Sequence, residues 1–369
     1  MRVAQVVASY YPKVGGVETH VRRVAEGCAV AGDQVTVLTH QPGGRPAEET
    51  VGPVRVLRFP LTVGLANYPL SLSLFGYLRT HASDFDVVHA HSYHTLVGQA
   101  AIGLGLPFVF TPHYHGTGHT RLRALLHHLS RPAGGRLFAA ADAVICVSAA
   151  ERDLVAGDFP ATERKLRVIP NGTDPRPAGV SPVSIATDER MVLTIGRLER
   201  YKRVDLVIRA CRALGPEVTL VIVGDGPDRP RLGQCASDAV RSGAVRFTGR
   251  ISDAELDRLL GTAAVVASAS EHEAFGLIVA DGLAAGARVV ASAIPAHFEV
   301  GGLAGADAPI TFVDPEDTGR FTAALAASLA RGRSEAGPLR LPSWADVTGG
   351  TRALYSQVCE MPQILEAEK

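Results

Sequence analysis

The sequence predicts an α/β protein of two domains, each a parallel β-sheet covered by helices on both faces. Short, nearly continuous apolar runs rich in β-branched residues alternate with helical patterns along the whole chain, which is typical of buried parallel strands and their crossover helices. The chain has 369 residues, and at about 150 residues per domain this length favours two domains. Hydrophobic residues make up 46% of the chain and charged residues 20%, so large cores can form and wholesale disorder is excluded.

The first half of the chain holds seven apolar runs that are short enough for strands, with five helical patterns among them. The predicted strands are Val3–Ala8, Val35–Thr39, Val54–Arg58, Val87–His89, Phe108–Thr111, Ala143–Val147 and Leu166–Ile169. The predicted helices are Val17–Ala31, Leu70–His81, Leu96–Leu104, Leu122–Leu129 and Ala149–Ala156.

The second half repeats this alternation. Its predicted strands are Met191–Ile195, Thr219–Val223, Val245–Thr248, Val265–Ala267, Arg288–Ala291 and Ile310–Val313. Its predicted helices are Val204–Leu214, Arg229–Ser242, Asp253–Leu260, Leu277–Ala285 and Thr318–Arg331. Between the halves, Asn171–Ser184 is rich in Pro, Gly and Ser and lacks apolar periodicity, so it is the predicted linker. We expect two Rossmann-like domains, at 1–174 and 175–349.

Charge and cysteine usage exclude several classes of protein. The 37 basic and 37 acidic residues cancel, which argues against a dedicated nucleic-acid binder. The five cysteines are scattered and form no CxxC pair, so neither a disulfide framework nor a zinc knuckle is expected, and a reducing compartment fits best. We see neither a signal peptide nor about 18 uninterrupted apolar residues, and expect a cytoplasmic protein.

Ligands of open parallel sheets bind beyond the carboxyl ends of the strands, so the segment after each strand is informative. After the first strand, Gly15 and Gly16 precede a helix whose amino end favours anions. Their spacing is not GxGxxG, and no acidic residue ends the second strand, so a nicotinamide dehydrogenase is disfavoured. A tight turn that requires a positive φ explains the glycine pair equally well.

Histidines follow two other strands of the first half, His89, His91 and His94 in one cluster and His113 with His115 in the other. Imidazole is the commonest metal ligand, but no carboxylate or thiolate is interleaved with these residues. We therefore favour polar loop histidines with local hydrogen bonds over a zinc site. For His113, directly after Thr-Pro at a strand end, we favour a single histidine that hydrogen-bonds a ligand.

Cationic and glycine-rich turns follow the strands of the second half. Arg197 and Lys202 lie five residues apart in GRLERYK, where a guanidinium and an ammonium suit a diphosphate. In isolation this segment would also fit a solvated charged turn. Two further strands end at VGDGP, which contains Gly224, and at FTGRIS, which contains Arg250 and Ile251.

The segment SASEHEAFGLIVADGLAAG, at 268–286, is the most specific pattern in the chain. Glu273 precedes a predicted helix whose first amides, at Phe275, Gly276 and Leu277, are free to receive phosphate oxygens. Asp281 follows on the second turn of that helix. Two carboxylates around a set of amides suit a polyhydroxylated ligand that carries a phosphate. Acidic residues that merely stabilise the helix dipole are the alternative.

In this order, eight segments resemble the retaining GT-B glycosyltransferases of family 4, which include bacterial mannosyl-, glucosyl- and N-acetylglucosaminyltransferases. They are YYPKVGGVETHV, TPHYHG, VSAAERD, VIPNGTD, GRLERYK, VGDGP, FTG and EAFGLIVAD, and together they span essentially the whole chain. The resemblance implies the GT-B fold, in which two Rossmann-like domains face a central cleft. It also implies a C-terminal helix, at about 350–369, that crosses back to the first domain.

The same resemblance assigns roles to the residues singled out above. Arg197 and Lys202 would hold the diphosphate of the donor, and Glu273 would contact the transferred sugar. The amides of Phe275, Gly276 and Leu277 would bind sugar hydroxyls and phosphates.

From the first domain, Gly15 and Gly16 would approach the diphosphate and His113 the transferred sugar. Gly224 would line the donor site, and Arg250 with Ile251 would face the nucleobase. Asp281 stands where the family usually has a second glutamate that holds the ribose, so the preference for a nucleotide does not follow from it.

The implied activity is transfer of a hexosyl or N-acetylhexosaminyl group from an NDP-sugar to an acceptor hydroxyl, with retention at the anomeric carbon. No cofactor or metal is required in this scheme, because Arg197 and Lys202 supply the positive charge. A sugar-nucleotide epimerase, a phosphorylase, a non-catalytic sugar-nucleotide binding protein and a histidine-rich metalloenzyme are the alternatives.

The expected partners are a nucleotide-sugar donor and a small-molecule, glycan or lipid-linked acceptor, with no nucleic acid. The segment His119–Arg131 is basic and partly amphipathic, which fits a helix on a membrane surface. An ordinary covering helix with a solvated basic face is the favoured alternative.

Overall fold

The computed structural model describes residues 1–13, 15–41, 47–65, 68–116, 121–174, 188–314, 316–334 and 339–367. The chain divides into two compact units. We call Met1–Gly172 with Trp344–Lys369 the N-terminal unit, and Thr173–Ser343 the C-terminal unit. Most of the predicted linker, at 175–184, lies outside the described residues.

An eight-stranded sheet forms the centre of the N-terminal unit, in the order β10-β9-β8-β7-β1-β2-β4-β3. All neighbouring strands are parallel except β3 and β4. The strands are β1 (Arg2–Val6), β2 (Gln34–His40), β3 (Glu48–Val51), β4 (Val54–Phe59), β7 (Val87–His91), β8 (Phe108–Thr111), β9 (Ala143–Cys146) and β10 (Leu166–Val168). A separate antiparallel pair joins β5 (Val63–Leu65) and β6 (Tyr68–Leu70).

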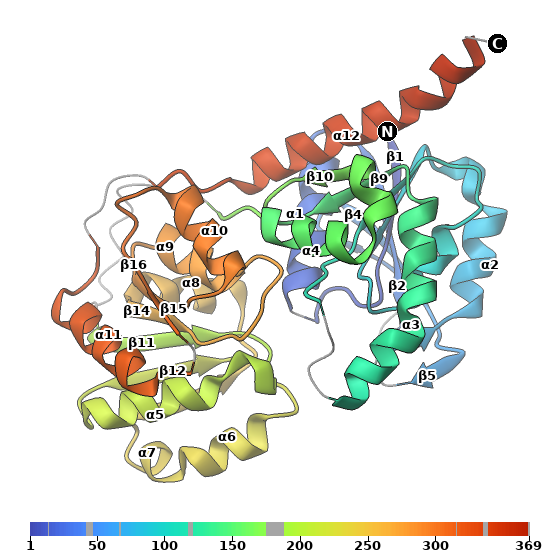
Figure 1. Ribbon diagram of the computed structural model, residues 1–369. Helices are drawn as coiled ribbons and strands as arrows, with labels where there is room; N and C mark the ends of the chain where they lie inside the picture. Colours follow the sequence, from blue (N-terminus) through green and yellow to red (C-terminus); the bar gives the residue numbers. More distant parts are fainter. Residues whose placement is uncertain are drawn as a thin grey trace. The chain divides into compact units, whose positions relative to one another are not determined.

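Helices cover both faces of this sheet, as the near-continuous apolar strands require. One face packs on α1 (Gly16–Val30) and α12 (Trp344–Ala367), and Figure 1 shows α12 running across this unit. The other face carries α2 (Leu72–Thr80), η1 (Ala82–Asp84), η2 (Val97–Ala101), α3 (Arg121–Ala140), α4 (Ala149–Asp158) and η3 (Pro160–Lys165). Because side chains alternate along a strand, Val3 packs toward α1 and α12, and Ala4 packs toward the opposite core.

The sheet of the C-terminal unit is wholly parallel, in the order β13-β12-β11-β14-β15-β16. Its strands are β11 (Asp188–Ile195), β12 (Thr219–Val223), β13 (Val245–Gly249), β14 (Ala263–Ser268), β15 (Arg288–Ser292) and β16 (Ile310–Val313). This is the doubly wound order, whose direction reverses between the first and fourth strands, here β11 and β14.

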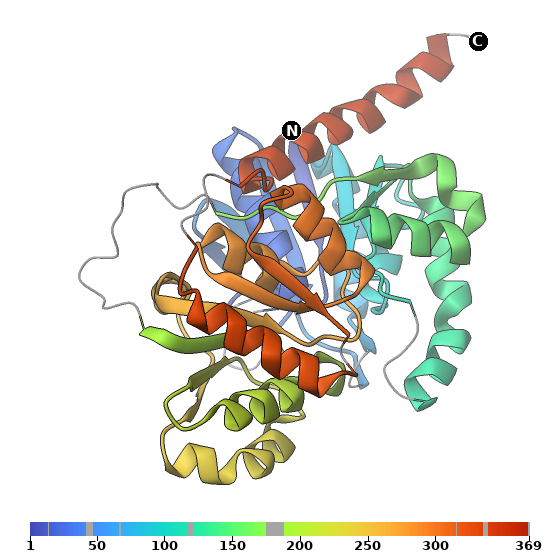
Figure 2. The ribbon, with the colours of Figure 1, turned by 60° about the vertical axis from the view of Figure 1, so that its left-hand side comes forward.

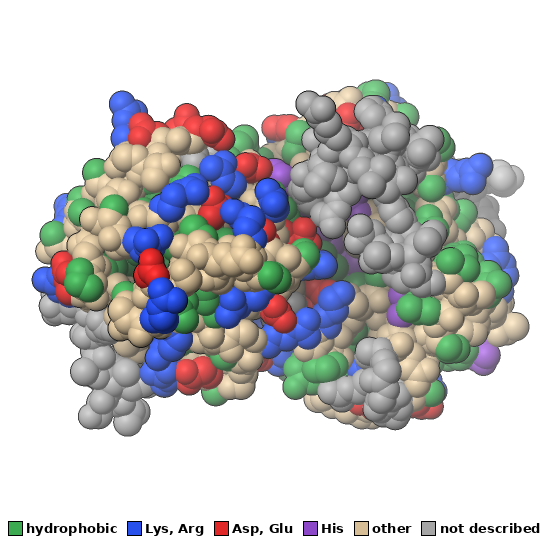
Figure 3. All heavy atoms as spheres, turned by 90° about the horizontal axis from the view of Figure 1, so that it is seen from below, with side chains coloured by type: hydrophobic (Ala, Val, Ile, Leu, Met, Phe, Trp, Pro, Cys, Tyr) green, Lys and Arg blue, Asp and Glu red, His purple; other side chains and the backbone are tan. Residues whose placement is uncertain are grey.

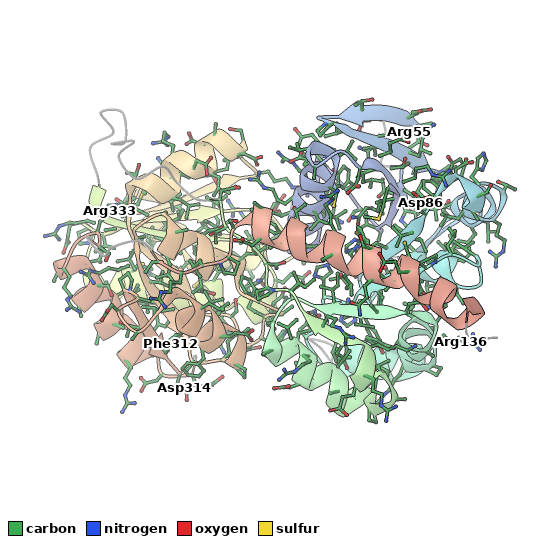
Figure 4. The ribbon with its side chains drawn as sticks, turned by 90° about the horizontal axis from the view of Figure 1, so that it is seen from above. Arg55, Asp86, Arg136, Phe312, Asp314 and Arg333 are labelled. Atoms are coloured by element: carbon green, nitrogen blue, oxygen red, sulfur yellow. The ribbon has the colours of Figure 1, made fainter. Side chains whose placement is uncertain are left out.

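The helices of the C-terminal unit are η4 (Arg200–Lys202), α5 (Val204–Leu214), α6 (Arg229–Cys235), α7 (Ser237–Arg241), α8 (Asp253–Thr262), α9 (Leu277–Ala284), α10 (Pro295–Ala304) and α11 (Thr318–Ala330). Figures 1 and 2 both show α11 beside α5. Arg333, labelled in Figure 4, follows α11 and donates hydrogen bonds to the carbonyl oxygens of Leu260, Ala263 and Ala285. These contacts tie together the ends of three elements.

The predicted class, two α/β domains with parallel sheets, is confirmed, and several predicted elements differ in detail. The predicted helix Leu96–Leu104 is only the short 3₁₀ helix η2, because Gly103 and Gly105 adopt positive φ values of 75° and 70° that a helix cannot contain. The predicted helix Arg229–Ser242 is interrupted at Ala236. The strand β3 carries Glu48 and Glu49 at the edge of its sheet and lacks the apolar run by which a buried strand is predicted.

The sequence patterns do not predict the helix α10, although Pro295 at its first position is a helix-start signal. The predicted helix Leu122–Leu129 belongs to the longer α3. The side chains at 119–130, on which the membrane-surface hypothesis rests, lie outside the described residues. Within the described parts of the chain, no helix combines the length and apolar character needed to cross a bilayer.

Candidate functional site

The switch point of the C-terminal sheet brings two predicted site segments together. The segment after β11 contains Arg197 and Lys202, and the segment after β14 contains Glu273. Because β11 and β14 are parallel neighbours, their carboxyl ends lie at the same edge, where the crossovers diverge and leave room for a ligand. The amide of Glu271 donates a 2.8 Å hydrogen bond to the carbonyl of Tyr201, which fixes one segment against the other.

An ion pair joins the two segments. The Lys202 Nζ donates to the Glu273 Oε1 at 2.5 Å, and the side chains are 18% and 13% exposed. Burial alone raises the pKa of the Glu273 carboxyl, but Lys202, His297 and a hydrogen bond from Ser270 together outweigh burial, and the pKa lies below its ordinary value. Burial likewise lowers the pKa of Lys202, but Glu273, with smaller contributions from Tyr201 and Glu199, more than compensates, and the pKa lies above its ordinary value. Both groups are therefore charged at neutral pH, and the site presents an ammonium and a carboxylate in a partly dry environment.

A pocket at the end of β11 is lined by Arg197, Lys202 and Ser270, among others. The side chain of Arg197 is 56% exposed, and its guanidinium lies 3.2 Å from the Glu199 carboxylate. Arg197 therefore borders the pocket but keeps its charge in solvent, whereas Lys202 is held inside it. Figure 3 shows basic side chains interspersed with acidic ones over the C-terminal unit.

Gly224 allows the turn after β12 to approach the turn after β11. Its φ is +120°, and a Cβ there would lie 2.0 Å from the carbonyl oxygen of Gly196. Its amide donates a 2.8 Å hydrogen bond to the carbonyl of Gly249, directly before Arg250 and Ile251. Arg250 is exposed and Ile251 half-buried. Both follow the edge strand β13, and neither belongs to the residues that line the pocket at β11.

The helix α9 of the same unit is preceded by Gly276, where any larger residue would collide with a neighbouring side chain. Gly276 is the residue before α9, with φ +100°, and a Cβ there would lie 2.8 Å from the His297 Cδ2. The first amides of the helix, among them those of Gly276 and Leu277, have no partner within the helix. Phe275 is buried just ahead of them. Asp281 is half-buried in the second turn of α9.

His297, on α10, is a residue of this site that the sequence did not reveal. Its Nδ1 donates to the carbonyl of Ser292 at 2.9 Å, and its buried Nε2 has no hydrogen-bond partner among the described residues. Burial lowers the pKa of the ring although Glu273 opposes that change. A neutral imidazole with an unshared acceptor nitrogen thus packs against Gly276. Pro295 at the start of α10 was the available signal.

In the N-terminal unit, Gly15 precedes α1 and Gly16 is its first residue. The φ of Gly15 is −175°, an extended conformation, so a turn that requires a positive φ does not explain this residue. A Cβ at Gly15 would lie 2.5 Å from the Glu18 carboxylate, which occupies the first turn of α1. The glycine therefore leaves room for an acidic group at the amino end of the helix.

His113 is buried after β8 and has a φ of 48°, a conformation uncommon for residues other than glycine and frequent at functional sites. The prediction that His89 and His91 are polar loop residues is wrong. Both lie inside β7 and are fully buried. His89 bonds the Tyr355 hydroxyl and the Thr111 Oγ1, each at 2.7 Å, and His91 bonds the Gln5 Oε1.

Comparisons with known proteins cover nearly all of the chain. The family model described as Glycosyltransferase Family 4 matches residues 14–176, and the one described as Glycosyl transferases group 1 matches residues 180–325. The chain is 28% identical to alpha-maltose-1-phosphate synthase of Mycolicibacterium smegmatis, over 97% of this chain and 100% of that protein. It is also 28% identical to a glycogen synthase of Mycobacterium tuberculosis, over 96% of this chain and 94% of that protein.

Solved structures share the fold. Sucrose-phosphate synthase from Thermosynechococcus elongatus superposes with a TM-score of 0.72 at 21% identity, over 100% of this chain and 99% of that one. HepE from Anabaena, solved in complex with UDP and glucose, superposes with a TM-score of 0.69 at 18% identity, over 100% and 99% of the two chains. The arrangement of two parallel-sheet domains is therefore the GT-B fold.

Proposed function

The chain belongs to the glycosyltransferases of family 4 and group 1, and we propose that it transfers a hexosyl or N-acetylhexosaminyl group from an NDP-sugar to an acceptor hydroxyl with retention. The observation that carries this proposal is the Lys202–Glu273 ion pair at the β11–β14 switch point. A buried ammonium there suits a diphosphate, and a carboxylate beside it suits sugar hydroxyls. HepE, which shares the fold, was solved with UDP and glucose, which supports a nucleotide-sugar donor.

The reaction breaks the bond between the anomeric carbon and a phosphate oxygen, and its electron pair stays on the departing diphosphate. The acceptor oxygen bonds the same carbon on the face that the diphosphate leaves, and the acceptor proton passes to the departing phosphate oxygen. Lys202, Arg197 and the amides of Phe275, Gly276 and Leu277 stabilise the negative charge that develops. Fixed cations and amides act here as an oxyanion hole does.

Other residues position the donor in this proposal. Glu273 accepts hydrogen bonds from the transferred sugar, and Asp281 contacts the ribose. Gly224 lets the chain approach the donor closely, and Arg250 with Ile251 face the nucleobase through their backbone.

The N-terminal unit supplies Gly15, Gly16 and His113. The amino end of α1 at Gly16 favours an anion such as the diphosphate. The His113 Nε2 is buried and has no hydrogen-bond partner among the described residues, which suits a sugar hydroxyl. No step of the proposed transfer passes through a metal.

A donor panel tests the proposal. Purified protein is mixed with UDP- and GDP-linked hexoses and N-acetylhexosamines, and thermal shift identifies the donor that binds. Release of the nucleoside diphosphate is then measured with acceptors of three kinds: small polyols, glycans and lipid-linked sugars. We expect acceptor-dependent release and a product whose anomeric configuration, read from its one-bond C1–H1 NMR coupling, matches that of the donor. Turnover without any acceptor would indicate an epimerase, and a requirement for inorganic phosphate would indicate a phosphorylase.

A further inference from the structure

Arg203 follows Lys202 directly and forms ion pairs with two other loops of the C-terminal unit. Its Nη1 donates to the Glu271 Oε1 at 3.0 Å and to the Glu316 Oε1 at 3.3 Å. Glu271 follows β14 and lies two residues before Glu273, whereas Glu316 follows β16. One guanidinium therefore ties together the segments that follow three strands of the sheet, β11, β14 and β16.

The backbone of Arg203 has a conformation that arginine rarely adopts. Arg203 lies between η4 and α5 with φ 47° and ψ 36°, in the left-handed region. Residues other than glycine, asparagine and aspartate are uncommon there because the Cβ crowds the backbone. Such a conformation costs free energy and persists only where the surrounding structure imposes it, often at a functional site.

The ion pairs of Arg203 do not explain it as a stabilising residue. The side chain of Arg203 is 22% exposed, and those of Glu271 and Glu316 are 42% and 79% exposed. The Asp205 carboxylate lies 4.0 Å from the Arg203 Nε and has two closer arginine partners. Ion pairs that water reaches contribute little to stability. Their contribution is of the same order as the cost of the left-handed backbone, so Arg203 adds little net stability.

The loop that Arg203 holds is the one that carries Glu273. The Glu271 amide donates to the Tyr201 carbonyl at 2.8 Å. The Tyr201 ring stacks on the His272 ring, with centroids 4.5 Å apart and an angle of 15° between the planes. Together with the Arg203–Glu271 contact, these interactions fix the two residues that precede Glu273 in the chain.

We propose that Arg203 is a positioning residue for sugar transfer, which holds the loop of Glu271 so that the Glu273 carboxylate faces the Lys202 ammonium. This inference rests on the proposed function, because it concerns the same ion pair. Arg203 acts through Glu273 and has no contact of its own with donor or acceptor in this scheme. Misplacement of reacting groups by about 1 Å lowers a rate by up to about 100-fold, so a loop that is held less firmly should slow transfer.

The coupling between Lys202 and Glu273 tests the proposal without any donor. The variants Lys202→Met, Glu273→Gln and their combination are compared by urea unfolding, first in the wild type and then in an Arg203→Asn background. Asparagine tolerates the left-handed conformation but cannot form the ion pairs. The coupling, expressed as a factor in the unfolding equilibrium constant, should be smaller by about fivefold or more in the Arg203→Asn background. Equal coupling in the two backgrounds would overturn the proposal.

Initial rates of NDP release, with the donor and acceptor that the wild type uses, give the second measurement. Arg203→Asn should lower kcat by about 10–100-fold. The KM for the donor should change by less than about threefold, because the charge that Lys202 meets develops mainly as the bond to the diphosphate breaks. The unfolding temperature should stay within about 4 °C of the wild type, since the lost ion pairs and the relieved strain offset each other. Arg203→Lys keeps a cation and should recover part of kcat.

The partner residue supplies a further variant and its matched control. Glu271→Gln should reproduce the loss of kcat, and its combination with Arg203→Asn should add little, because both changes act through one contact. The control is Glu255→Gln on α8. Glu255 pairs with Arg258 and is 41% exposed, close to the 42% of Glu271. This control should leave both kcat and the Lys202–Glu273 coupling unchanged.

The outcomes separate this inference from the proposed function. A fall in stability that parallels the fall in kcat, with no recovery in Arg203→Lys, would make Arg203 a purely structural residue and contradict the inference. A wild type that released NDP with no donor would contradict the proposed function. In that case the coupling measurement, which needs no donor, would still decide whether Arg203 positions the ion pair.

Discussion

Replacing Lys202 by methionine should slow sugar transfer severely and also destabilise the C-terminal unit. In the proposed mechanism its ammonium is the buried donor that meets the departing diphosphate. Loss of one such donor raises a barrier by about 2.7–4 kcal/mol, which corresponds to a kcat lower by about 10²–10³. Methionine is similar in length to lysine, so the variant removes the charge with little change in packing.

The effect on stability follows from the partner left behind. In the wild type the Lys202 ammonium lies 2.5 Å from the Glu273 carboxylate. The variant leaves this carboxylate buried without that cation. Removing one partner of a buried pair costs about 3–5 kcal/mol, and we expect about 3 kcal/mol because both side chains remain partly exposed. The native pKa of Glu273 is depressed, so the pair stabilises the fold above the ordinary glutamate pKa of 4.5. The difference between wild type and variant should therefore shrink as the pH falls through the folded-state pKa.

A double-mutant cycle separates the two effects. The variants Lys202→Met, Glu273→Gln and their combination are compared by urea unfolding and by initial rates of NDP release. The combination should recover part of the stability, because no unpaired charge remains, but none of the activity. Arg241→Met is the matched control, since Arg241 pairs with Asp238 at the surface, where the side chains are 75% and 70% exposed. It should cost less than about 1 kcal/mol. A kcat for Lys202→Met within about tenfold of wild type would refute the assigned role.

Two further predictions concern the contact at Gly276 and the burial of His20. Gly276→Ala should destabilise the protein by about 1–3 kcal/mol and weaken donor binding in thermal shift, because its φ is +100° and a Cβ would contact His297. Gly302→Ala, in α10 with open space around it, should be neutral or stabilising. Adding His297→Ala to Gly276→Ala should recover the steric part of the loss, and simple additivity of the two changes in urea unfolding would contradict the proposed contact. Burial lowers the pKa of His20 to about 4. Between about pH 6.5 and 4, the unfolded chain therefore binds more protons at this residue than the folded chain does. As the pH is lowered through this range, the free energy of unfolding should decrease by up to about 1.4 kcal/mol per pH unit on account of His20. Unfolding curves at pH 7, 6 and 5 should show a shallower loss for His20→Gln and an unchanged loss for His81→Gln.

The parallel strands were predictable because their evidence is local. A strand buried on both faces must be apolar over consecutive residues, and Thr219–Val223 and Phe108–Thr111 have the predicted bounds. The edge strand β3 and the glycine-containing helix α10 lack that pattern, and they were missed. Whether a segment continues as a helix depended on single backbone conformations, such as the positive φ of Gly103.

The candidate site was predictable as a set of residue types and not as a set of contacts. Lys202 and Glu273 were both singled out because each follows a predicted strand, but nothing in the sequence pairs them across 71 positions. The pairing follows from the strand order, which places β14 directly beside β11. His297 became visible only through its contact with Gly276.

The histidines show most clearly which features the sequence predicts and which only the tertiary structure decides. Apolar periodicity and turn residues act over a few neighbouring positions, so they were enough to predict the sheets, the crossovers and the chemistry-bearing loops. Proximity along the chain grouped His89, His91 and His94. The tertiary structure instead placed His91 with His20 and His113, because strand register and the packing of α1 on the sheet determine where each ring points. Contacts between distant segments arise from the packing of the whole fold, so local patterns in the sequence do not predict them.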